Sequence, residues 1–268
     1  MSAFVHPSAI VEDGAQLADG VKVGPFCHVG PEVSLGRGVE LLSHVVVAGR
    51  TSIGPETRIF PFASIGHPPQ DLKYRGEASK LVIGARCQIR ENVTVNPGTA
   101  GGTMETRIGD DCLLMNCAHV AHDVEIGNHV VIAAYVAVAG HCKIGDYVGF
   151  GGMCGVHQYV RIGAHAFIGA HSMIDADVIP YGMAVGNRAR LSGLNLVGLK
   201  RRKFDREAIH SLRAAYRMIF SSEGTLKERV EDAANLFKDE PMVQDVVKFI
   251  VGANDRALCL PVNVPAED

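Results

Sequence analysis

The stretch that decides the fold runs from Ile108 to Ile174 and reads IGDDCLLMNCAHVAHDVEIGNHVVIAAYVAVAGHCKIGDYVGFGGMCGVHQYVRIGAHAFIGAHSMI. Every sixth residue in it, counted from Ile108, is Ile, Leu, Val or Phe. The same count of six holds from Val5 to Ile65 and resumes over residues 83–95. An α-helix repeats every ~3.6 residues and a strand every second residue, so a period of six indicates a repeating architecture.

The positions between these aliphatic residues follow a strand-and-corner pattern. Residues two apart in a strand share a face, so each sixth-residue aliphatic and the residue two before it point inward. Gly and Asp gather just after the aliphatic residues, as in Ile144-Gly145-Asp146, where a corner is expected. Three hexads make a turn of 18 residues, the same gap that separates Ile65 from Ile83. The pattern predicts parallel strands coiled into a β-helix over residues 1–187, whereas a β-sandwich requires turns about every 8–12 residues.

Two segments break the count of six, near residues 66–82 and 96–107. A coil of stacked strands accommodates such Pro-containing or Gly-rich insertions only as outward loops. Beyond residue 187 the period disappears and helix signals begin: Asp205 as a cap, a capping box at Thr225–Glu228, and Pro241 as a first-turn residue. We therefore expect residues 188–268 to form a small α-helical domain over the open end of the coil.

Composition excludes several classes of protein. The chain has 268 residues and a net charge of −3, which gives no whole-protein argument for binding nucleic acid. No apolar run approaches the roughly 20 residues of a membrane span, and we expect no signal peptide because no basic region precedes an apolar stretch. Five of the seven cysteines occupy the inward small-residue position, so we expect free thiols and a reducing, cytoplasmic setting.

One histidine cluster departs from the pattern of exposed corner residues. His119 stands one position before an aliphatic residue and points outward, and His122 follows at the corner edge, beside Asp123. His141 comes 19 residues after His122, one coil further on, so the two should be neighbours. An imidazole oriented by a carboxylate is a competent general base near neutral pH. Two other interpretations stay open: a surface histidine with a local hydrogen bond, and a zinc site made by three outward histidines from neighbouring subunits.

A basic segment lies where the coil should meet the helices. From Gly186 to Arg206 the chain has seven Lys or Arg residues against one acidic residue, including Lys200-Arg201-Arg202-Lys203. Such a run is compatible with a solvated surface, and equally with binding of a diphosphate or an acidic protein partner.

Four motifs outside the repeat occur in a characteristic order. They are Asp71-Leu72-Lys73-Tyr74, Asn116–Asp123 (NCAHVAHD), His157-Gln158-Tyr159 and Gly198-Leu199-Lys200-Arg201-Arg202. With the hexads and the helical tail, nearly the whole chain closely resembles the UDP-N-acetylglucosamine O-acyltransferases, which open lipid A synthesis in Gram-negative bacteria. The resemblance implies a left-handed β-helix, an exception to the usual right-handed crossover, in a homotrimer with active sites between subunits.

The resemblance also implies a reaction and its residues. An (R)-3-hydroxyacyl group passes from acyl carrier protein to the 3-hydroxyl of UDP-N-acetylglucosamine. His122 is the implied general base, Asp123 orients it, and the backbone N–H of Gly140 meets the oxyanion. The implied substrate contacts are Asp71, Lys73, His119, His141, His157 and Gln158, with Asn195, Arg201 and Arg202 for the nucleotide or the carrier protein. No metal and no diffusible cofactor is expected, because the pantetheine arrives attached to its carrier.

Two departures from the family pattern concern the acceptor. The chain has Asn96-Pro97-Gly98 where the family commonly has His-Arg-Gly, and Asn195-Leu196-Val197 lacks the family's acidic residue. One hypothesis is therefore a preference for a 3-amino analogue of the sugar, with an amide as product. A second hypothesis concerns Ala170, at the position that closes the acyl groove in the family: its small side chain predicts longer acyl chains.

Three competing functions differ from this interpretation. The sister N-acyltransferases normally carry an extra N-terminal uridine-binding domain, which we do not expect here because the hexads start at Val5. A zinc carbonic anhydrase of the same fold would lack the motifs at residues 71–74 and 198–202. A non-catalytic solenoid scaffold is the third class.

Overall fold

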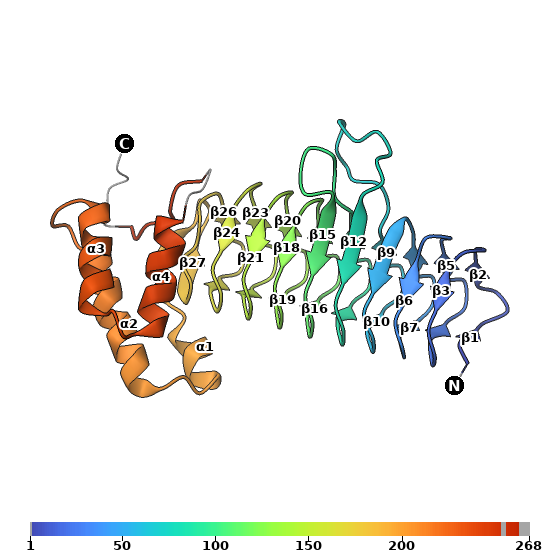
Figure 1. Ribbon diagram of the computed structural model, residues 1–268, viewed down its shortest axis with the longest axis horizontal. Coiled ribbons are helices and arrows are strands. Elements are labelled where there is room, and N and C mark those ends of the chain that lie inside the picture. Colours follow the sequence, from blue (N-terminus) through green and yellow to red (C-terminus); the bar gives the residue numbers. More distant parts are fainter. Residues whose placement is uncertain (1, 253–255, 263–268) are drawn as a thin grey trace.

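The computed structural model describes residues 2–252 and 256–262. Short strands in this part of the chain coil into a three-sided prism, and helices follow at one end (Figure 1). The coil is the left-handed parallel β-helix that the family resemblance implied. Its strands form three sheets, and each turn of the coil contributes one strand to each sheet.

The first sheet contains 11 strands: β1 (Phe4–Val5), β4 (Lys22–Val23), β7 (Glu40–Leu41), β10 (Arg58–Ile59), β13 (Gln88–Ile89), β16 (Leu113–Leu114), β19 (Val131–Ile132), β22 (Gly149–Phe150), β25 (Phe167–Ile168), β27 (Gly182–Val185) and β28 (Arg190–Leu194). The second contains β2 (Ile10–Val11), β5 (His28–Val29), β8 (Val46–Val47), β11 (Ser64–Ile65), β14 (Thr94–Val95), β17 (His119–Val120), β20 (Ala137–Val138), β23 (Gly155–Val156) and β26 (Met173–Ile174). The third contains β3 (Gln16–Leu17), β6 (Ser34–Leu35), β9 (Arg50–Ile53), β12 (Lys80–Ile83), β15 (Glu105–Ile108), β18 (Glu125–Ile126), β21 (Lys143–Ile144) and β24 (Arg161–Ile162).

The period of six is the register of the stacked strands. Val120 pairs with Val138, and Ile126 pairs with Ile144, so aliphatic residues 18 positions apart lie above one another. These side chains are buried and fill the interior of the prism. The prediction for the cysteines is confirmed: all seven are free, and the five in the inward position are buried.

Both interruptions of the repeat leave the prism at one corner. Residues 66–79 connect β11 to β12 and residues 96–104 connect β14 to β15, so each runs from the second sheet to the third. β12 still pairs with β9 on one side and β15 on the other, so the coil continues beneath the loops. The two loops project outward, as predicted, and the structure shows that they leave from the same edge (Figure 1). The next three turns pass this edge, which we call the loop corner, at residues 121–124, 139–142 and 157–160.

Strand structure extends beyond the predicted boundary at residue 187. β28 turns back on β27 as an antiparallel partner, with a register shift between Met183 and Ala184. A terminal sheet edge offers unpaired backbone groups, and an added strand satisfies them whether or not the hexad continues. The region predicted to be helical, residues 188–268, therefore begins with a strand, and its first helix starts only at Leu196.

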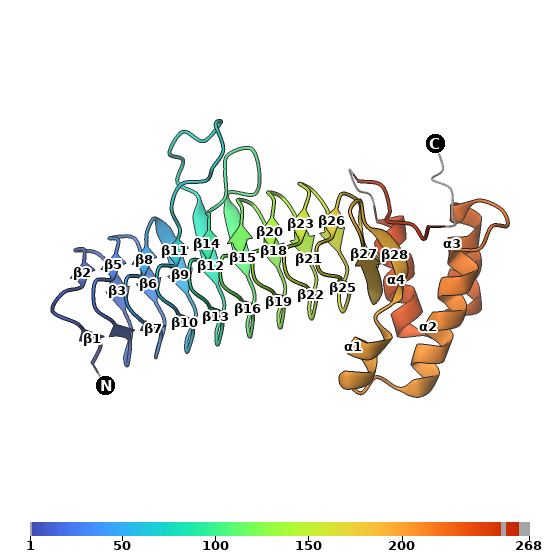
Figure 2. The ribbon, with the colours of Figure 1, turned by 180° about the vertical axis from the view of Figure 1, so that it is seen from behind.

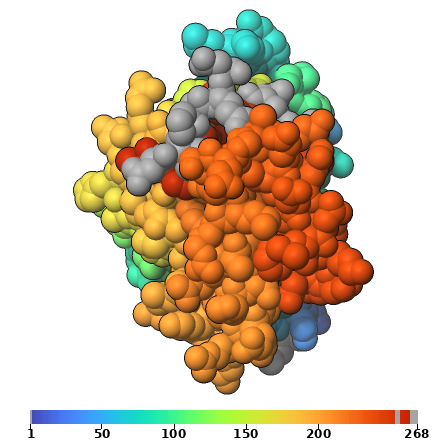
Figure 3. Space-filling view, turned by 90° about the vertical axis from the view of Figure 1, so that its left-hand side faces the viewer, coloured from blue at the N-terminus to red at the C-terminus, as the bar shows by residue number. Residues whose placement is uncertain are grey.

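Within the described residues, four helices cover the end of the prism (Figures 2 and 3): α1 (Leu196–Arg201), α2 (Arg206–Ile219), α3 (Leu226–Leu236) and α4 (Pro241–Val251). The predicted starts are confirmed: Asp205 accepts from two first-turn N–H groups, Thr225 and Glu228 form a capping box, and Pro241 opens α4. The short helix α1 was not predicted. Residues 253–255 and 263–268 of the expected helical domain lie outside the described residues. Among the described helices, none combines the length and the apolar character that a bilayer crossing requires.

Candidate active site

His122 and Asp123 lie together at the loop corner, on the turn that follows β17. The Nδ1 atom of His122 is 2.8 Å from Oδ2 of Asp123. The Asp123 side chain is fully buried, whereas the His122 side chain keeps 10% of its surface exposed. A carboxylate only accepts hydrogen bonds, so Nδ1 carries the proton and Nε2 presents a free lone pair. The pair therefore has the geometry of an oriented general base.

The Gly-rich loop 96–104 folds over the carboxylate of Asp123. The Thr99 N–H lies 3.1 Å from both carboxylate oxygens, and the Thr99 hydroxyl donates to Oδ2 at 2.6 Å. The Thr103 N–H donates to Oδ1 at 2.8 Å. Gly102 allows this approach, because a Cβ there would overlap the carboxylate. The insertion thus holds the residue that orients His122.

These hydrogen bonds keep Asp123 ionised. Burial by itself raises the pKa of a carboxyl group. Here the donors from Thr99 and the bond from His122 outweigh that burial, and the pKa of Asp123 lies below its usual value. A buried carboxylate that stays charged stabilises the imidazolium that forms when His122 takes up a proton.

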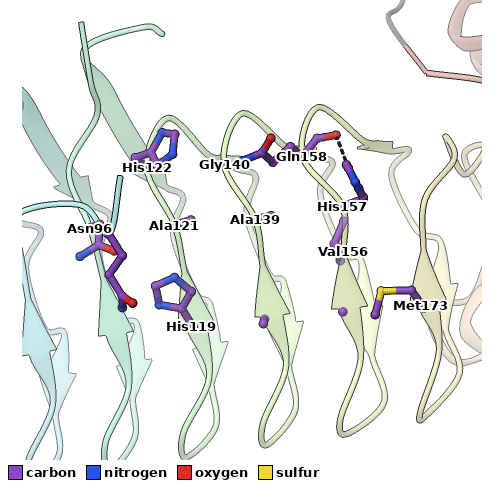
Figure 4. Close-up of a pocket in the computed structure, with 13 residues that line it drawn as sticks. Asn96, His119, Ala121, His122, Ala139, Gly140, Val156, His157, Gln158 and Met173 are labelled. Carbon is purple, nitrogen blue, oxygen red and sulfur yellow. Dashed lines mark hydrogen bonds between the residues drawn. The ribbon is translucent and has the colours of Figure 1, made fainter. Parts of the chain in front are cut away.

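Gly140 lies directly against the imidazole of His122, one coil further on (Figure 4). A Cβ on Gly140 would lie 2.6 Å from Cε1 and 2.8 Å from Nε2 of His122, so only glycine fits beside the ring as it stands. Within the described residues the Gly140 N–H has no hydrogen-bond partner, while its carbonyl accepts from Tyr159 at 3.1 Å. The site therefore places an uncommitted donor next to the base.

His141 and His119 complete the polar wall of the site. His141 meets His122 edge to face with ring centroids 4.9 Å apart, and stacks on Tyr159 at 4.4 Å. Burial lowers the pKa of His141, and burial together with His122 lowers that of His119. Nδ1 of His119 lies 2.7 Å from the Thr94 hydroxyl. Both rings therefore favour the neutral form, as hydrogen-bonding groups beside the dyad.

A cavity of about 340 Å³ opens beside the dyad, lined by Gln70, Asn96, His119, Ala121, His122, Ala137, Ala139, Gly140, Gly155, Val156, His157, Gln158 and Met173. Four of these are aligned partners in neighbouring strands of the second sheet, in the order His119, Ala137, Gly155 and Met173. The small residues between His119 and Met173 leave an apolar trough (Figure 4). Met173 forms its end, since a Cβ on Gly155 would lie 3.1 Å from the Met173 sulfur.

The loop 66–79 reaches toward this cavity from the same corner. Gln70 lines the cavity, and the charges of Asp71 and Lys73 act on His141. Asn96 holds the base of the loop: its amide donates to the carbonyl of His67 at 3.0 Å. The unusual Asn96 is thus a buried structural contact as well as a lining residue.

Comparison with known proteins identifies the family to which the chain is similar. The model described as Udp N-acetylglucosamine O-acyltransferase, Domain 2, matches residues 177–259, and that for bacterial transferase hexapeptide repeats matches residues 105–140. A protein of Rhizobium leguminosarum bv. trifolii is 49% identical over 97% of this chain and 96% of its own length. It is named acyl-[acyl-carrier-protein]–UDP-N-acetylglucosamine O-acyltransferase. The chain belongs to this family.

Other members of the O-acyltransferase family agree over their whole length. The protein of the same name from Caulobacter vibrioides is 52% identical over 96% of this chain and 98% of its own. The solved structure of LpxA from Acinetobacter baumannii superposes with a TM-score of 0.92 at 39% identity, covering 95% of this chain and 99% of that one. The named proteins are O-acyltransferases, and they lend no support to the hypothesis of an amide product.

Within a single chain, the residues expected from the family resemblance lie at two separate places. The structure brings His119, His122, Asp123, Gly140, His141, His157 and Gln158 together at the loop corner and its cavity, with Asp71 and Lys73 nearby. Asn195, Arg201 and Arg202 lie elsewhere, at the corner between the third and first sheets.

This second group makes contacts within the fold. The amide of Asn195 donates to the His165 carbonyl at 2.9 Å, and its oxygen caps α1. Arg202 donates to the Tyr147 carbonyl at 2.8 Å and lies over the Tyr147 ring. Ala170, on the turn between β25 and β26, is not among the residues that line the cavity.

Sequence reasoning about the family missed Thr99 and Thr103 as partners of Asp123. The available signal was the Gly-Gly pair at residues 101–102, which marks a close approach of backbone to another group.

One group of potential metal ligands occurs within the described residues: His122, Asp123 and His141, whose ligand atoms lie within 4.8 Å of one another. A carboxylate has about four lone-pair sites. In Asp123 they already accept from Thr99, Thr103 and the Nδ1–H of His122. This donor set favours a proton-transfer pair over a zinc site, which requires lone pairs directed at the ion.

Proposed function

We propose that the chain transfers an (R)-3-hydroxyacyl group from acyl carrier protein to the 3-hydroxyl of UDP-N-acetylglucosamine, the first step of lipid A synthesis. The observation that carries the proposal is the His122–Asp123 pair beside the free N–H of Gly140, in a chain of the O-acyltransferase family. The reaction needs a base that deprotonates a hydroxyl and a hydrogen-bond donor for an oxyanion. His122 and the Gly140 N–H provide these two groups side by side.

His122 acts as the general base. Its Nε2 lone pair takes the proton of the sugar hydroxyl while that oxygen attacks the thioester carbonyl. The buried carboxylate of Asp123 keeps Nδ1 protonated, which fixes the tautomer and offsets the charge of the imidazolium.

The Gly140 N–H stabilises the tetrahedral intermediate. As the C–O bond forms, the carbonyl electrons move to oxygen, and a preplaced backbone donor is worth about 2.7–4 kcal/mol at such a position. The intermediate then collapses and the C–S bond breaks. The imidazolium of His122 gives the leaving thiolate the proton that came from the sugar hydroxyl. The products are the acylated sugar nucleotide and the free thiol of the carrier, so protons and electrons balance.

The trough along the second sheet suits the hydrocarbon part of the donor. It runs from His119 over Ala137 and Gly155 to Met173, and it begins beside the reacting groups. Side chains of this size leave room for methylene groups, each of which gains about 0.8 kcal/mol when buried.

We further propose a homotrimer with active sites between subunits. In one chain Arg201 and Arg202 lie at a different prism corner from His122, so a neighbouring subunit could supply them. Exposed apolar residues such as Tyr135, Met153 and Met173 along the prism support such packing.

The basic surface supports the carrier protein as partner. Lys200, Arg206, His210 and Arg213, with one acidic residue, Glu207, line a hollow of about 680 Å³ between α1 and α2. An acidic protein would be attracted to it. The donor's pantetheine arrives on that carrier, so the proposal needs no metal and no diffusible cofactor. The free cysteines suit a cytoplasmic setting.

The deciding experiment is a coupled assay with hydroxyacyl carrier proteins and two acceptors, UDP-N-acetylglucosamine and its 3-amino analogue. We expect turnover of the 3-hydroxyl sugar, faster than that of the amine. A strong preference for the amine would instead favour the amide hypothesis, and no turnover with either would favour a scaffold.

His122→Ala tests the mechanism itself. We expect a loss of about 10²–10⁴-fold in kcat with the assembly intact by size-exclusion chromatography. His28→Ala on β5, away from the loop corner, is the matched control and should keep full activity. Metal analysis of the purified protein separates this proposal from a zinc enzyme.

A further inference from the structure

Arg256, near the end of the described chain, reaches back to the loop corner. Its Nη2 lies 2.7 Å from Nδ1 of His157, and its Nε donates to the Gln158 carbonyl at 2.9 Å. The segment is anchored to the prism just beyond this arginine: the Asp177 N–H donates to the Ala257 carbonyl and the Asp177 carbonyl accepts from the Cys259 N–H, both at 2.8 Å. A residue 99 positions away in sequence is thereby held against two residues of the cavity wall.

The contact decides which nitrogen of His157 carries a proton. A guanidinium has five N–H donors and no acceptor, so Nδ1 of His157 must accept. The proton of the neutral ring then sits on Nε2, for which the described residues provide no hydrogen-bond partner. A second arrangement exists: Nδ1 also lies 3.4 Å from the Gln158 carbonyl, and an Nδ1–H could donate there (Figure 4). Arg256 excludes it, because two N–H groups cannot face each other at 2.7 Å.

We propose that Arg256 is a positioning residue that sets His157 as an Nε2–H donor toward an oxygen of the bound substrate. The inference rests on the proposed function, since it takes the cavity as the place where substrate binds. His157 lines that cavity and is an exposed residue. Without Arg256, the ring proton moves from Nε2 to Nδ1, where it is donated to the Gln158 carbonyl. The substrate then loses a hydrogen-bond donor. Among metal-binding histidines, losing the hydrogen bond that fixes the ring tautomer typically lowers affinity or activity by about ten- to a hundredfold, and we expect an effect at the lower end of that range here.

The tautomer can be measured without any activity. The protein is labelled with ¹⁵N-histidine, the His157 signals are identified by their loss in His157→Ala, and the two ring nitrogens are distinguished by their long-range couplings. We expect Nε2–H in the native protein and a shift toward Nδ1–H in Arg256→Ala. An Nδ1–H ring in the native protein overturns the proposal, whether or not the enzyme transfers acyl groups.

A double-mutant cycle then links the tautomer to turnover. We expect Arg256→Ala to lower kcat/KM about tenfold in the native background and to have no effect in the His157→Ala background. Equal losses in both backgrounds overturn the proposal, because Arg256 would then act independently of His157. Arg256→Lys keeps a donor and should restore most of the activity, which a lost fold could not explain. Arg37→Ala, an exposed arginine at the far end of the prism, is the matched control.

Absence of turnover in the native enzyme contradicts the proposed function alone. In that case the ring measurement still decides whether Arg256 sets the tautomer of His157, so the two failures remain distinguishable.

Discussion

The hydroxyl of Thr99 donates to Oδ2 of Asp123 at 2.6 Å, across 24 residues of sequence. This bond links an insertion in the repeat to the carboxylate behind the candidate base. The insertion that breaks the hexad therefore supplies the donors that keep a buried carboxylate charged and aimed at His122.

Thr99→Val removes this donor and preserves the shape of the side chain. We expect a loss of about 1–3 kcal/mol of stability, because a buried acceptor loses a partner. We also expect roughly a tenfold fall in kcat with little change in KM, since Asp123 orients the base and does not touch the substrate. Steady-state kinetics and thermal unfolding measure the two effects.

Thr57→Val is the matched control for that substitution. Thr57 is fully buried and its hydroxyl donates to the Gly84 carbonyl at 2.9 Å, away from the loop corner. It should lose comparable stability and keep native kcat. If Thr99→Val also kept native kcat, the Thr99 hydroxyl would have no part in orienting His122 through Asp123.

Gly140→Ala tests the close approach of the backbone to His122. The added methyl would lie 2.6 Å from Cε1 of the ring, so the imidazole must move. A displaced base and a displaced oxyanion donor should together lower kcat by about 10²-fold or more.

Gly152→Ala adds the same methyl where its nearest neighbour is the Ala134 carbonyl at 3.4 Å, an ordinary contact. That variant should remain active. Native kcat in Gly140→Ala would show that the ring position is not critical.

The stability of the protein should fall as pH drops below the ordinary histidine range. Burial lowers the pKa of His141 in the folded state. An unfolded histidine titrates near about 6.5. Below about pH 6.5, His141 of the unfolded chain takes up a proton more readily than His141 of the folded protein. The contribution of His141 to stability is therefore fully present above the unfolded pKa, and it is lost as the pH falls toward the folded pKa.

His141→Asn should therefore flatten the fall in thermal midpoint between about pH 7 and pH 5. His171→Asn is the control, because His171 is an exposed corner residue with a similar left-handed backbone, φ 59° against 64°. Asn tolerates that conformation at both positions. An unchanged slope in His141→Asn would contradict the assignment.

Met173 should limit acyl length, because it ends the trough of small residues. We expect Met173→Ala to shift preference toward longer hydroxyacyl donors, measured with a series of ten- to sixteen-carbon carrier proteins. Val131→Ala, an exposed apolar position on the first sheet, should leave the preference unchanged. Ala170→Met tests the expectation from the sequence that a bulky side chain at this corner shortens the accepted chain. A profile unchanged in both variants would place the end of the groove elsewhere.

Much of the fold follows from the sequence by short-range rules. The period of six places Val120 over Val138 because each coil repeats the same alternation, and the caps at Asp205 and Thr225 start helices because they satisfy local N–H groups. The strand β28 was not foreseen, because it forms to cover a sheet edge that exists only once the coil is built.

The sequence by itself determined the prism, the outward loops and the proximity of His122 to His141, since all three are consequences of one repeated register. Only the tertiary structure decided that Thr99 clamps Asp123, that Asn96 holds a neighbouring loop and that Arg256 reaches His157. These contacts join segments that follow no repeat. Their partners are set by the path of each loop over the folded coil, and that path is a property of the assembled surface rather than of any local pattern.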